Sequence, residues 1–173
     1  MKKKTQGFTL IELLVTLAIM AILLTVGVPS FRDFIMNNRI TTQANEFVAS
    51  IQTARSLAIR HQRPAQICVS ANPAAATPAC TASTDWTQGW FVWVDLDRDS
   101  TIDNNEVMRV TQALAGTTTF DSTTRNAFTY DPRGLVDNGD TLDLCDDRAN
   151  ETGRRITISA VGRVNIAPFN SCP

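Results

Sequence analysis

The stretch FTLIELLVTLAIMAILLTVGV, from Phe8 to Val28, decides how this chain is organised. Its only charged side chain is Glu12. About 20 apolar residues in a helix, at ~1.5 Å each, cover the ~30 Å of hydrocarbon in a bilayer. The stretch is therefore predicted to be a membrane-spanning helix. An ionised carboxylate within such a span costs roughly 2.5 kcal/mol or more unless it finds a partner, so Glu12 is expected to have a function.

The distribution of charge predicts the orientation of this span. Three lysines, Lys2 to Lys4, precede it, and the sequence contains no lysine after it. Positive charge is retained on the cytoplasmic side, which predicts a single-pass membrane protein with a cytoplasmic N-terminus and the rest of the chain outside. The whole chain has 16 lysines and arginines against 17 acids, so the exported part is mildly acidic. That balance does not favour a nucleic acid or an anionic lipid as partner.

A cleaved secretory signal is the alternative interpretation, because it too begins with lysines and an apolar run. Three features oppose it. The run lacks an early Ala-x-Ala cleavage site, contains the acid Glu12, and continues into an amphipathic helix.

The helical pattern runs from Thr9 to about Arg63, and Pro29 stands where the apolar span ends. Beyond Pro29, apolar residues recur at helical spacing and predict one buried stripe: Ile40, Ala44, Phe47, Val48, Ile51, Ala54 and Ala58. Pro64 ends the pattern. The remaining residues, 64–173, number about 110, which suffices for one modest core. They contain short runs rich in β-branched or aromatic residues, which predict strands: Ala65 to Val69, Trp90 to Val94, Glu106 to Val110, Ala127 to Tyr130, Thr141 to Leu144 and Arg155 to Ser159.

The four cysteines, Cys68, Cys80, Cys145 and Cys172, all follow the span. An even number on the exported side of a small domain predicts two disulfides. Three pairings are allowed. Cys68–Cys80 with Cys145–Cys172 is favoured, because the first closes a short loop and the second fastens the penultimate residue to the body. The spacing lacks the Cys-x-x-Cys pairs of a zinc site.

The N-terminus resembles that of type IV pilins and pseudopilins. A lysine-bearing leader ends in Gly7 and is followed by Phe8-Thr9-Leu10-Ile11-Glu12. The resemblance implies that a prepilin peptidase cuts between Gly7 and Phe8 and methylates the new amine of Phe8. It also implies that this amine pairs with Glu12 of a neighbouring subunit, so that neither charge is buried alone. Glu12 would then serve assembly and register rather than catalysis.

The head resembles the GspH/FimT family of minor pilins and pseudopilins. The similarity rests on four segments in order: Thr53-Ala54-Arg55-Ser56, Trp86 with Gly89-Trp90, Tyr130-Asp131-Pro132-Arg133-Gly134, and Gly162-Arg163. It implies an α+β pilin fold, in which a long N-terminal transmembrane and spine helix packs on a C-terminal antiparallel β-sandwich-like head. The expected organisation is a leader over residues 1–7, a transmembrane segment over 8–28, a spine over 29–63 and a periplasmic head over 64–173.

The same resemblance implies a structural role near the tip of a filament, where the subunit helps to prime assembly. Its expected partners are other major and minor pilins or pseudopilins, the prepilin peptidase and the inner-membrane assembly platform. A type IV pilus and a type II secretion pseudopilus share this N-terminal chemistry, and the sequence leaves the choice between them open.

An acidic loop offers a calcium site as a minority alternative. Acids and a threonine occupy the ligand positions of an EF-hand loop: Asp95, Asp97, Asp99, Thr101, Asp103 and Glu106. Ser100 stands where that loop requires glycine, and the flanking segments resemble strands rather than helices. A polar hairpin connection is the favoured interpretation, so no cofactor is expected.

DNA is the second alternative partner. Some family members resemble DNA receptors that use a Gly-Arg-x-Arg motif, in which two cations grip adjacent phosphates. Here Gly162-Arg163-Val164-Asn165 lacks the second cation, although Arg154 and Arg155 could assist Arg163.

An enzyme is not expected. His61 is the only histidine, and the sequence has no nucleophile elbow, P-loop or nucleotide fingerprint. The tryptophans Trp86, Trp90 and Trp93 could form a ligand platform. The alternation of Trp90 and Val92 instead favours a strand with one face in the core.

Overall fold

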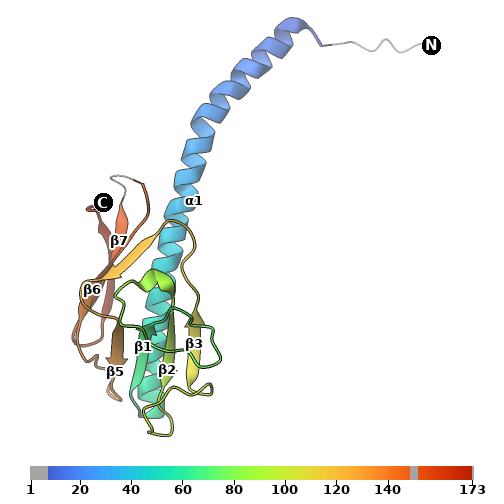
Figure 1. The fold of residues 1–173 in the computed structure, drawn as a ribbon. Coiled ribbons are helices and arrows are strands. Elements are labelled where there is room, and N and C mark those ends of the chain that lie inside the picture. The colour runs from blue at the N-terminus through green and yellow to red at the C-terminus, as the bar shows by residue number, and fades with distance from the viewer. Residues whose placement is uncertain (1–7, 149–151, 173) are drawn as a thin grey trace. The chain divides into compact units, whose positions relative to one another are not determined.

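The computed structural model describes residues 8–148 and 152–172 (Figure 1). The predicted leader, residues 1–7 including Gly7, lies outside the described residues. The chain divides into two compact units, Met1–Asn38 and Arg39–Pro173. The elements are the helix α1 (Leu10–His61), the short 3-10 helix η1 (Trp86–Gln88) and the strands β1 (Ala65–Val69), β2 (Trp90–Val94), β3 (Val107–Thr111), β4 (Thr119–Ser122), β5 (Ala127–Tyr130), β6 (Asp140–Cys145), β7 (Gly153–Ile158) and β8 (Val164–Phe169).

Helix α1 has 52 residues and continues through Pro29. The predicted helix, Thr9 to about Arg63, is thus confirmed to within two residues at either end. Its buried residues in the second unit are Ile40, Gln43, Ala44, Phe47, Ser50, Ile51, Ala54, Leu57 and Ala58. They include every residue of the predicted stripe except Val48, which is partly buried against the core. The compact second unit therefore starts inside the helix, at Arg39, and the spine contributes to its core.

Eight strands form two antiparallel sheets in the second unit. The first has the order β3-β2-β1-β5 and the second the order β4-β6-β7-β8. In the first sheet Ala65 of β1 pairs with both Val94 of β2 and Tyr130 of β5. The α1–β1 junction, the end of β2 and the end of β5 therefore lie at one end of this sheet. The predicted α+β fold, a long helix with an antiparallel two-sheet head, is confirmed.

Aromatic rings hold the helix to both sheets. Phe47 of α1 is fully buried, and its ring meets Trp86, Trp90 and Phe120 edge-on, at centroid distances of 5.1, 5.4 and 5.0 Å. Trp86 also stacks on Phe128, and its Nε1 donates to the carbonyl of Arg125. The core interpretation of Trp90 and Val92 is confirmed, because both are completely inaccessible to solvent, and Trp86 is buried as well.

The sequence missed two strands, β4 and β8. Both lie at the edges of the second sheet, where one side of the strand has no neighbour and the hydrophobic signal is weak. Strand β8 contains Pro168, which cannot donate to a sheet ladder and is tolerated on an edge strand. The other six strands appear as predicted, with shifts of one or two residues at some ends.

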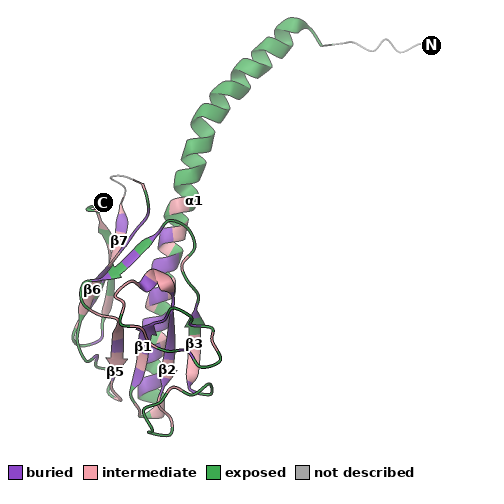
Figure 2. Ribbon diagram, in the orientation of Figure 1, coloured by how far each residue is buried: buried purple, intermediate pink, exposed green. Residues whose placement is uncertain are grey.

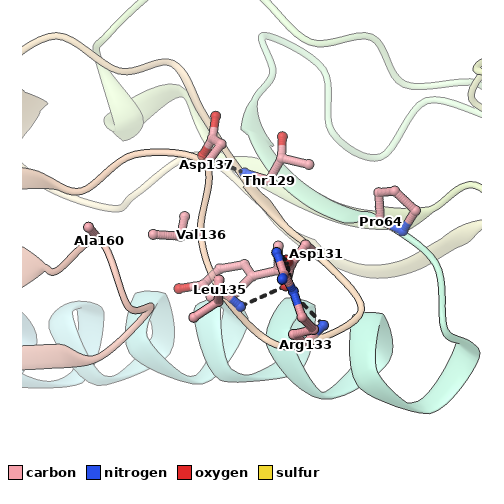
Figure 3. A pocket seen from close by; sticks show the side chains of 9 residues that line it. Pro64, Thr129, Asp131, Arg133, Leu135, Val136, Asp137 and Ala160 are labelled. Atoms are coloured by element: carbon pink, nitrogen blue, oxygen red, sulfur yellow. Dashed lines mark hydrogen bonds and ion pairs between the residues drawn. The ribbon is translucent and has the colours of Figure 1, made fainter.

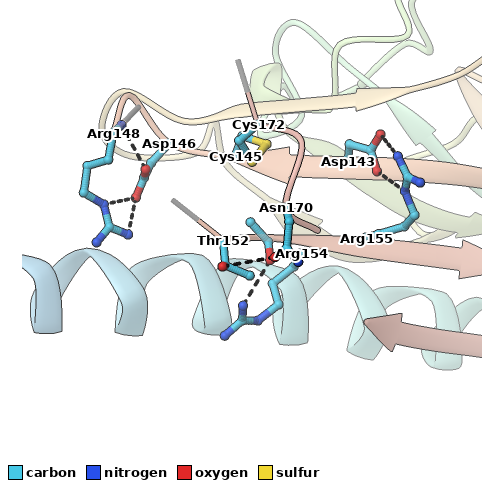
Figure 4. The surroundings of a disulfide bond; sticks show 10 residues. Asp143, Cys145, Asp146, Arg148, Thr152, Arg154, Arg155, Asn170 and Cys172 are labelled. Carbon is cyan, nitrogen blue, oxygen red and sulfur yellow. Dashed lines mark hydrogen bonds and ion pairs between the residues drawn. A yellow bond between two sulfur atoms is a disulfide. The ribbon is translucent and has the colours of Figure 1, made fainter. Parts of the chain in front are cut away.

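Both disulfides have the favoured pairing. Cys68 bonds to Cys80, and Cys145 bonds to Cys172, with Cα atoms 5.5 and 5.7 Å apart. The second bond fastens the segment after β8 to the end of β6 (Figure 4). A Cβ placed on Gly153 would lie 2.5 Å from Sγ of Cys172, so only glycine leaves room for this bond beside β7.

Candidate functional site

Glu12 takes part in a capping box at the start of α1. Thr9 precedes the first helical residue, Leu10. The backbone N–H and the hydroxyl of Thr9 both donate to Oε2 of Glu12, at 3.0 Å, while the backbone N–H of Glu12 donates to Oγ1 of Thr9 at 3.3 Å. Such reciprocal bonds satisfy donors that a helix start leaves unpaired. The pattern Thr-x-x-Glu is visible in the sequence, so the role of Thr9 could have been predicted and was missed.

The two oxygens of the Glu12 carboxylate differ. Oε2 accepts both Thr9 bonds, whereas Oε1 has no bond to another described residue. Glu12 therefore has one oxygen that stabilises its own helix and one available to an external cation.

The first unit is largely apolar, and most of its described side chains are exposed. Every residue from Phe8 to Ile35 is exposed, and Figure 2 colours this part of α1 green throughout. Among the described residues, α1 is the one helix long and apolar enough to cross a membrane, with a window of mean hydropathy 2.5. The hydroxyls of Thr16 and Thr25 donate to carbonyls one turn back, so they carry no unpaired donor into an apolar environment.

The three arginines predicted as candidate DNA ligands have different surroundings. Arg154 lies on the same face of β7 as Ile156, because side chains two residues apart in a strand point the same way. The Arg154 side chain reaches α1, where its Nη2 donates to Oγ1 of Thr41 at 3.4 Å. Arg155 points to the opposite face (Figure 4). Its guanidinium donates two bonds to the Asp143 carboxylate, at 2.6 and 2.7 Å.

The carboxylate of Asp143 offsets the positive charge of Arg155. The bond to this carboxylate raises the pKa of the arginine, and the guanidinium lies 4.0 Å from the centre of the Phe169 ring. Arg163 lies apart, in the exposed turn between β7 and β8. The phosphates of a DNA strand would thus meet one cation in the turn, Arg163, and a second, Arg155, that is already paired with an acid.

The acidic loop between β2 and β3 groups part of the candidate calcium set. Ligand oxygens of Asp95, Asp97 and Asp99 lie within 4.8 Å of one another. Ser100 adopts a left-handed conformation, with φ of 60°, so the turn forms without the glycine of an EF-hand loop. The Thr101 hydroxyl and backbone N–H donate to Asp99 and hold its pKa below the ordinary value.

Glu106, the last residue of the candidate set, faces inward. Only 1% of its surface is exposed. Its Oε1 accepts from the backbone N–H of Leu96 at 2.5 Å, and its Oε2 from that of Asp103 at 3.4 Å. Its carboxylate is therefore bonded to the backbone of the same loop.

Three of the four family-like segments meet at the C-terminal end of α1. Arg55 of α1 donates to the carbonyl of Gly162 at 3.5 Å. A Cβ placed on Gly162 would lie 2.8 Å from the carbonyl oxygen of Gly134 and 2.8 Å from the Tyr130 ring. Both glycines have a positive φ. These residue types therefore serve close packing between turns that are distant in the sequence.

A comparison with family models identifies the chain. Residues 43–162, more than half of it, match the model described as type II transport protein GspH. The chain belongs to the GspH family. Residues 2–28 of this GspH protein also match the prokaryotic N-terminal methylation motif. Together the two matches show a GspH-family protein that carries a pilin-type N-terminal methylation motif.

Curated relatives match less than half of this GspH protein. A fimbrial protein of Pseudomonas aeruginosa is 35% identical over 71 residues, which are 41% of this chain and 44% of that protein. The prepilin peptidase-dependent protein D of Escherichia coli K12 is 34% identical over 58 residues, or 34% of this chain and 40% of that protein. The chain thus spans less than half the length of these relatives.

A solved structure confirms the fold. The crystal structure of the type IV minor pilin FimU from Pseudomonas aeruginosa superimposes with a TM-score of 0.60. It is 23% identical in sequence, and the alignment covers 81% of this chain and 96% of that one.

Proposed function

We propose that this GspH protein is a non-enzymatic minor subunit that is processed, membrane-anchored and then incorporated near the tip of a type IV pilus or type II secretion pseudopilus, where it helps to prime assembly. Cleavage between Gly7 and Phe8, followed by methylation of Phe8, produces the mature N-terminus. The N-terminus starts in the cytoplasm and the head lies in the periplasm. Its partners are other pilins or pseudopilins, the prepilin peptidase and the inner-membrane assembly platform.

The carboxylate of Glu12 carries this proposal. It stands at the beginning of an exposed apolar helix, held by Thr9 through Oε2 and open at Oε1. An unpaired charge in a membrane is costly, so a cation on a neighbouring subunit that reaches Oε1 lowers the free energy of the assembled state. The amine of a neighbour's Phe8 supplies such a cation in the proposed filament.

Two substitutions at Glu12 test the proposal. Glu12→Gln keeps the size of the side chain and an oxygen that can accept the Thr9 bonds, but it removes the charge. Glu12→Ala removes both. We expect both variants to be cleaved and inserted normally, and both to be depleted from sheared filaments. Normal recovery of Glu12→Gln in filaments would contradict the role of the charge.

A calcium-stabilised tip subunit is the second candidate, favoured by the grouping of Asp95, Asp97 and Asp99. The inward bonds of Glu106 oppose it, since they occupy both oxygens of the acid that would complete the site. We infer that the loop is ordered by its own hydrogen bonds. A DNA-binding subunit is less favoured, because Asp143 pairs with Arg155 and Arg154 turns to α1.

A further inference from the structure

Three aspartates lie next to one another across the second sheet. Asp121 of β4 is opposite Asp143 of β6 on one side, and on the other side it forms an isolated bridge with Asp85, which precedes η1. Residues opposite one another in antiparallel strands point to the same face, with Cβ atoms about 4.5–5.5 Å apart. Here it is the face away from the core, since Asp121 is exposed between the buried residues Phe120 and Ser122. We call the three aspartates the acid row.

The two outer acids of the row are held by bonds of their own. Asp85 caps η1, with its Oδ1 accepting from the backbone N–H of Thr87 at 2.9 Å. Asp143 accepts both guanidinium bonds of Arg155 (Figure 4). Each acid would lose these bonds if its carboxylate turned away from the middle of the row. Like charges directly opposite one another destabilise a sheet, so this arrangement has a cost.

The middle acid, Asp121, has no such partner. Among the described residues, none donates a hydrogen bond to its carboxylate or forms an ion pair with it. Partial desolvation, and next the charge of Asp85, raise the pKa of Asp121. The acid row therefore keeps one negative charge without compensation at neutral pH.

The other charged groups of the adjoining segments do not supply the missing partner. Asp140, the second acid of β6, accepts a bond from Ser122 at 2.6 Å. Arg155 of β7, the next cation in register, gives its bonds to Asp143. Residues 81–88 contain no cation, and β4 contains no second charged residue. Within this part of the chain, protonation of the middle acid is the remaining way to remove the repulsion.

The direction of the pH effect follows from the direction of the pKa shift. An acid whose pKa is raised in the folded state binds its proton more tightly there than in the unfolded chain. Its contribution to stability is therefore present below the ordinary pKa of an aspartate and is lost as the pH rises through the folded value. The pKa values of Asp131, Asp140 and Asp146 are lowered instead, so these acids act in the opposite direction.

We propose that Asp121 makes the contact between β4 and the segment before η1 sensitive to pH, because its charge weakens this contact at neutral pH and its protonation strengthens it. The contact includes the bond from the backbone N–H of Ser122 to the carbonyl of Thr84, at 3.0 Å. It also adjoins Trp86 of η1, which is buried in the core. All of these groups belong to the second unit, so the inference does not depend on the proposed function.

Thermal unfolding of the full-length protein in detergent micelles tests this proposal. Tryptophan fluorescence reports on the head, because all three tryptophans lie there. Asp121→Asn keeps the size of the side chain and removes its charge. We expect the variant to melt about 1–5 °C above wild type at neutral pH, and the difference to vanish below the ordinary pKa of an aspartate. No gain at neutral pH, or a gain that persists unchanged in acid, would overturn the proposal.

Asp131→Asn is the matched control, because the shift in the pKa of Asp131 has the opposite sign. Asp131 accepts from the backbone N–H of Leu135 at 2.9 Å and forms an ion pair with Arg133 at 2.9 Å (Figure 3). We expect this variant to melt below wild type at neutral pH, with the difference closing in acid. A rise for both variants would indicate a general effect of reducing the negative charge of the head, and the assignment to the acid row would fail.

A double-mutant cycle locates the repulsion. Asp85→Asn removes the neighbouring charge and keeps a residue that can cap η1. We expect Asp121→Asn to raise the melting temperature less in the Asp85→Asn background than in the wild type, because the two charges interact. An equal gain in both backgrounds would place the cost outside the contact between β4 and the segment before η1, and would refute the proposal.

Discussion

Replacing Phe47 with alanine should be among the most destabilising single changes in the head. Truncating a buried phenylalanine costs about 3–5 kcal/mol, because transfer energy is lost and a cavity remains. Phe47 is fully buried and makes three edge-on ring contacts. Each such contact contributes about 0.5–1.5 kcal/mol beyond the buried area. These contacts place the expected fall in the free energy of unfolding in the upper part of the truncation range, at about 4–5 kcal/mol.

Urea unfolding of the soluble head, from Met36 onward, measures this loss. A change of 1 kcal/mol shifts the melting temperature by roughly 3–5 °C in a domain of this size, so a parallel thermal scan should show a drop of about 12–25 °C. Phe169→Ala is the matched control. Phe169 is half-buried and lies beneath the Arg155 guanidinium, a contact of about 0.5–1 kcal/mol at such a site.

The comparison between the two phenylalanines decides the argument. Phe169→Ala should lower the free energy of unfolding by about 1–1.5 kcal/mol, counting the cation–π contact and partial burial. If Phe47→Ala costs no more than Phe169→Ala, the helix does not belong to the core of the head, and the assignment of residues from Arg39 onward to this unit fails.

Three further predictions concern processing and ligands. A Gly7→Val variant should retain residues 1–7, because a side chain there obstructs the peptidase; wild-type protein extracted from membranes should have the mass of a chain that begins at methylated Phe8, and any other start would contradict the leader assignment. Calcium should change the melting temperature of the soluble head little; a concentration-dependent rise that Asp97→Ala abolishes would instead establish an ion site, since a ligand of the folded state stabilises it by mass action. DNA binding in gel-shift assays should be weak or undetectable at micromolar protein; a salt-sensitive shift that Arg163→Ala reduces would move DNA uptake ahead of the purely structural role.

The apolar stretch from Phe8 to Val28 and the stripe on the rest of the helix are local patterns. Helical spacing repeats within a few residues, so α1 and its buried face were predictable from the sequence. The same holds for strands in the middle of each sheet, since burial enriches them in β-branched and aromatic residues. The capping box of Thr9 and Glu12 is equally local, at a separation of three residues.

Edge strands and the partners of charged side chains depend on non-local pairing instead. Nothing near Pro168 in the sequence indicates that β8 ends a sheet, and only the register opposite β7 shows why proline is tolerated there. Likewise, Arg154 and Arg155 are equivalent as sequence. Strand alternation sends one toward Thr41 of α1 and the other to Asp143 on β6, which separates two cations that the sequence offers as a pair.

The sequence by itself determined the apolar span, the long helix and the resemblance to pilin-like proteins, because each rests on composition or short-range spacing. The tertiary structure alone decided which candidate side chains are available to a partner. It directed the Glu106 carboxylate to the backbone of its own loop, paired Arg155 with an acid, and brought Ile59, Gly134 and Gly162 together from three distant segments. Exposure and proximity arise only when the two sheets and the helix pack, so residue order cannot specify them in advance.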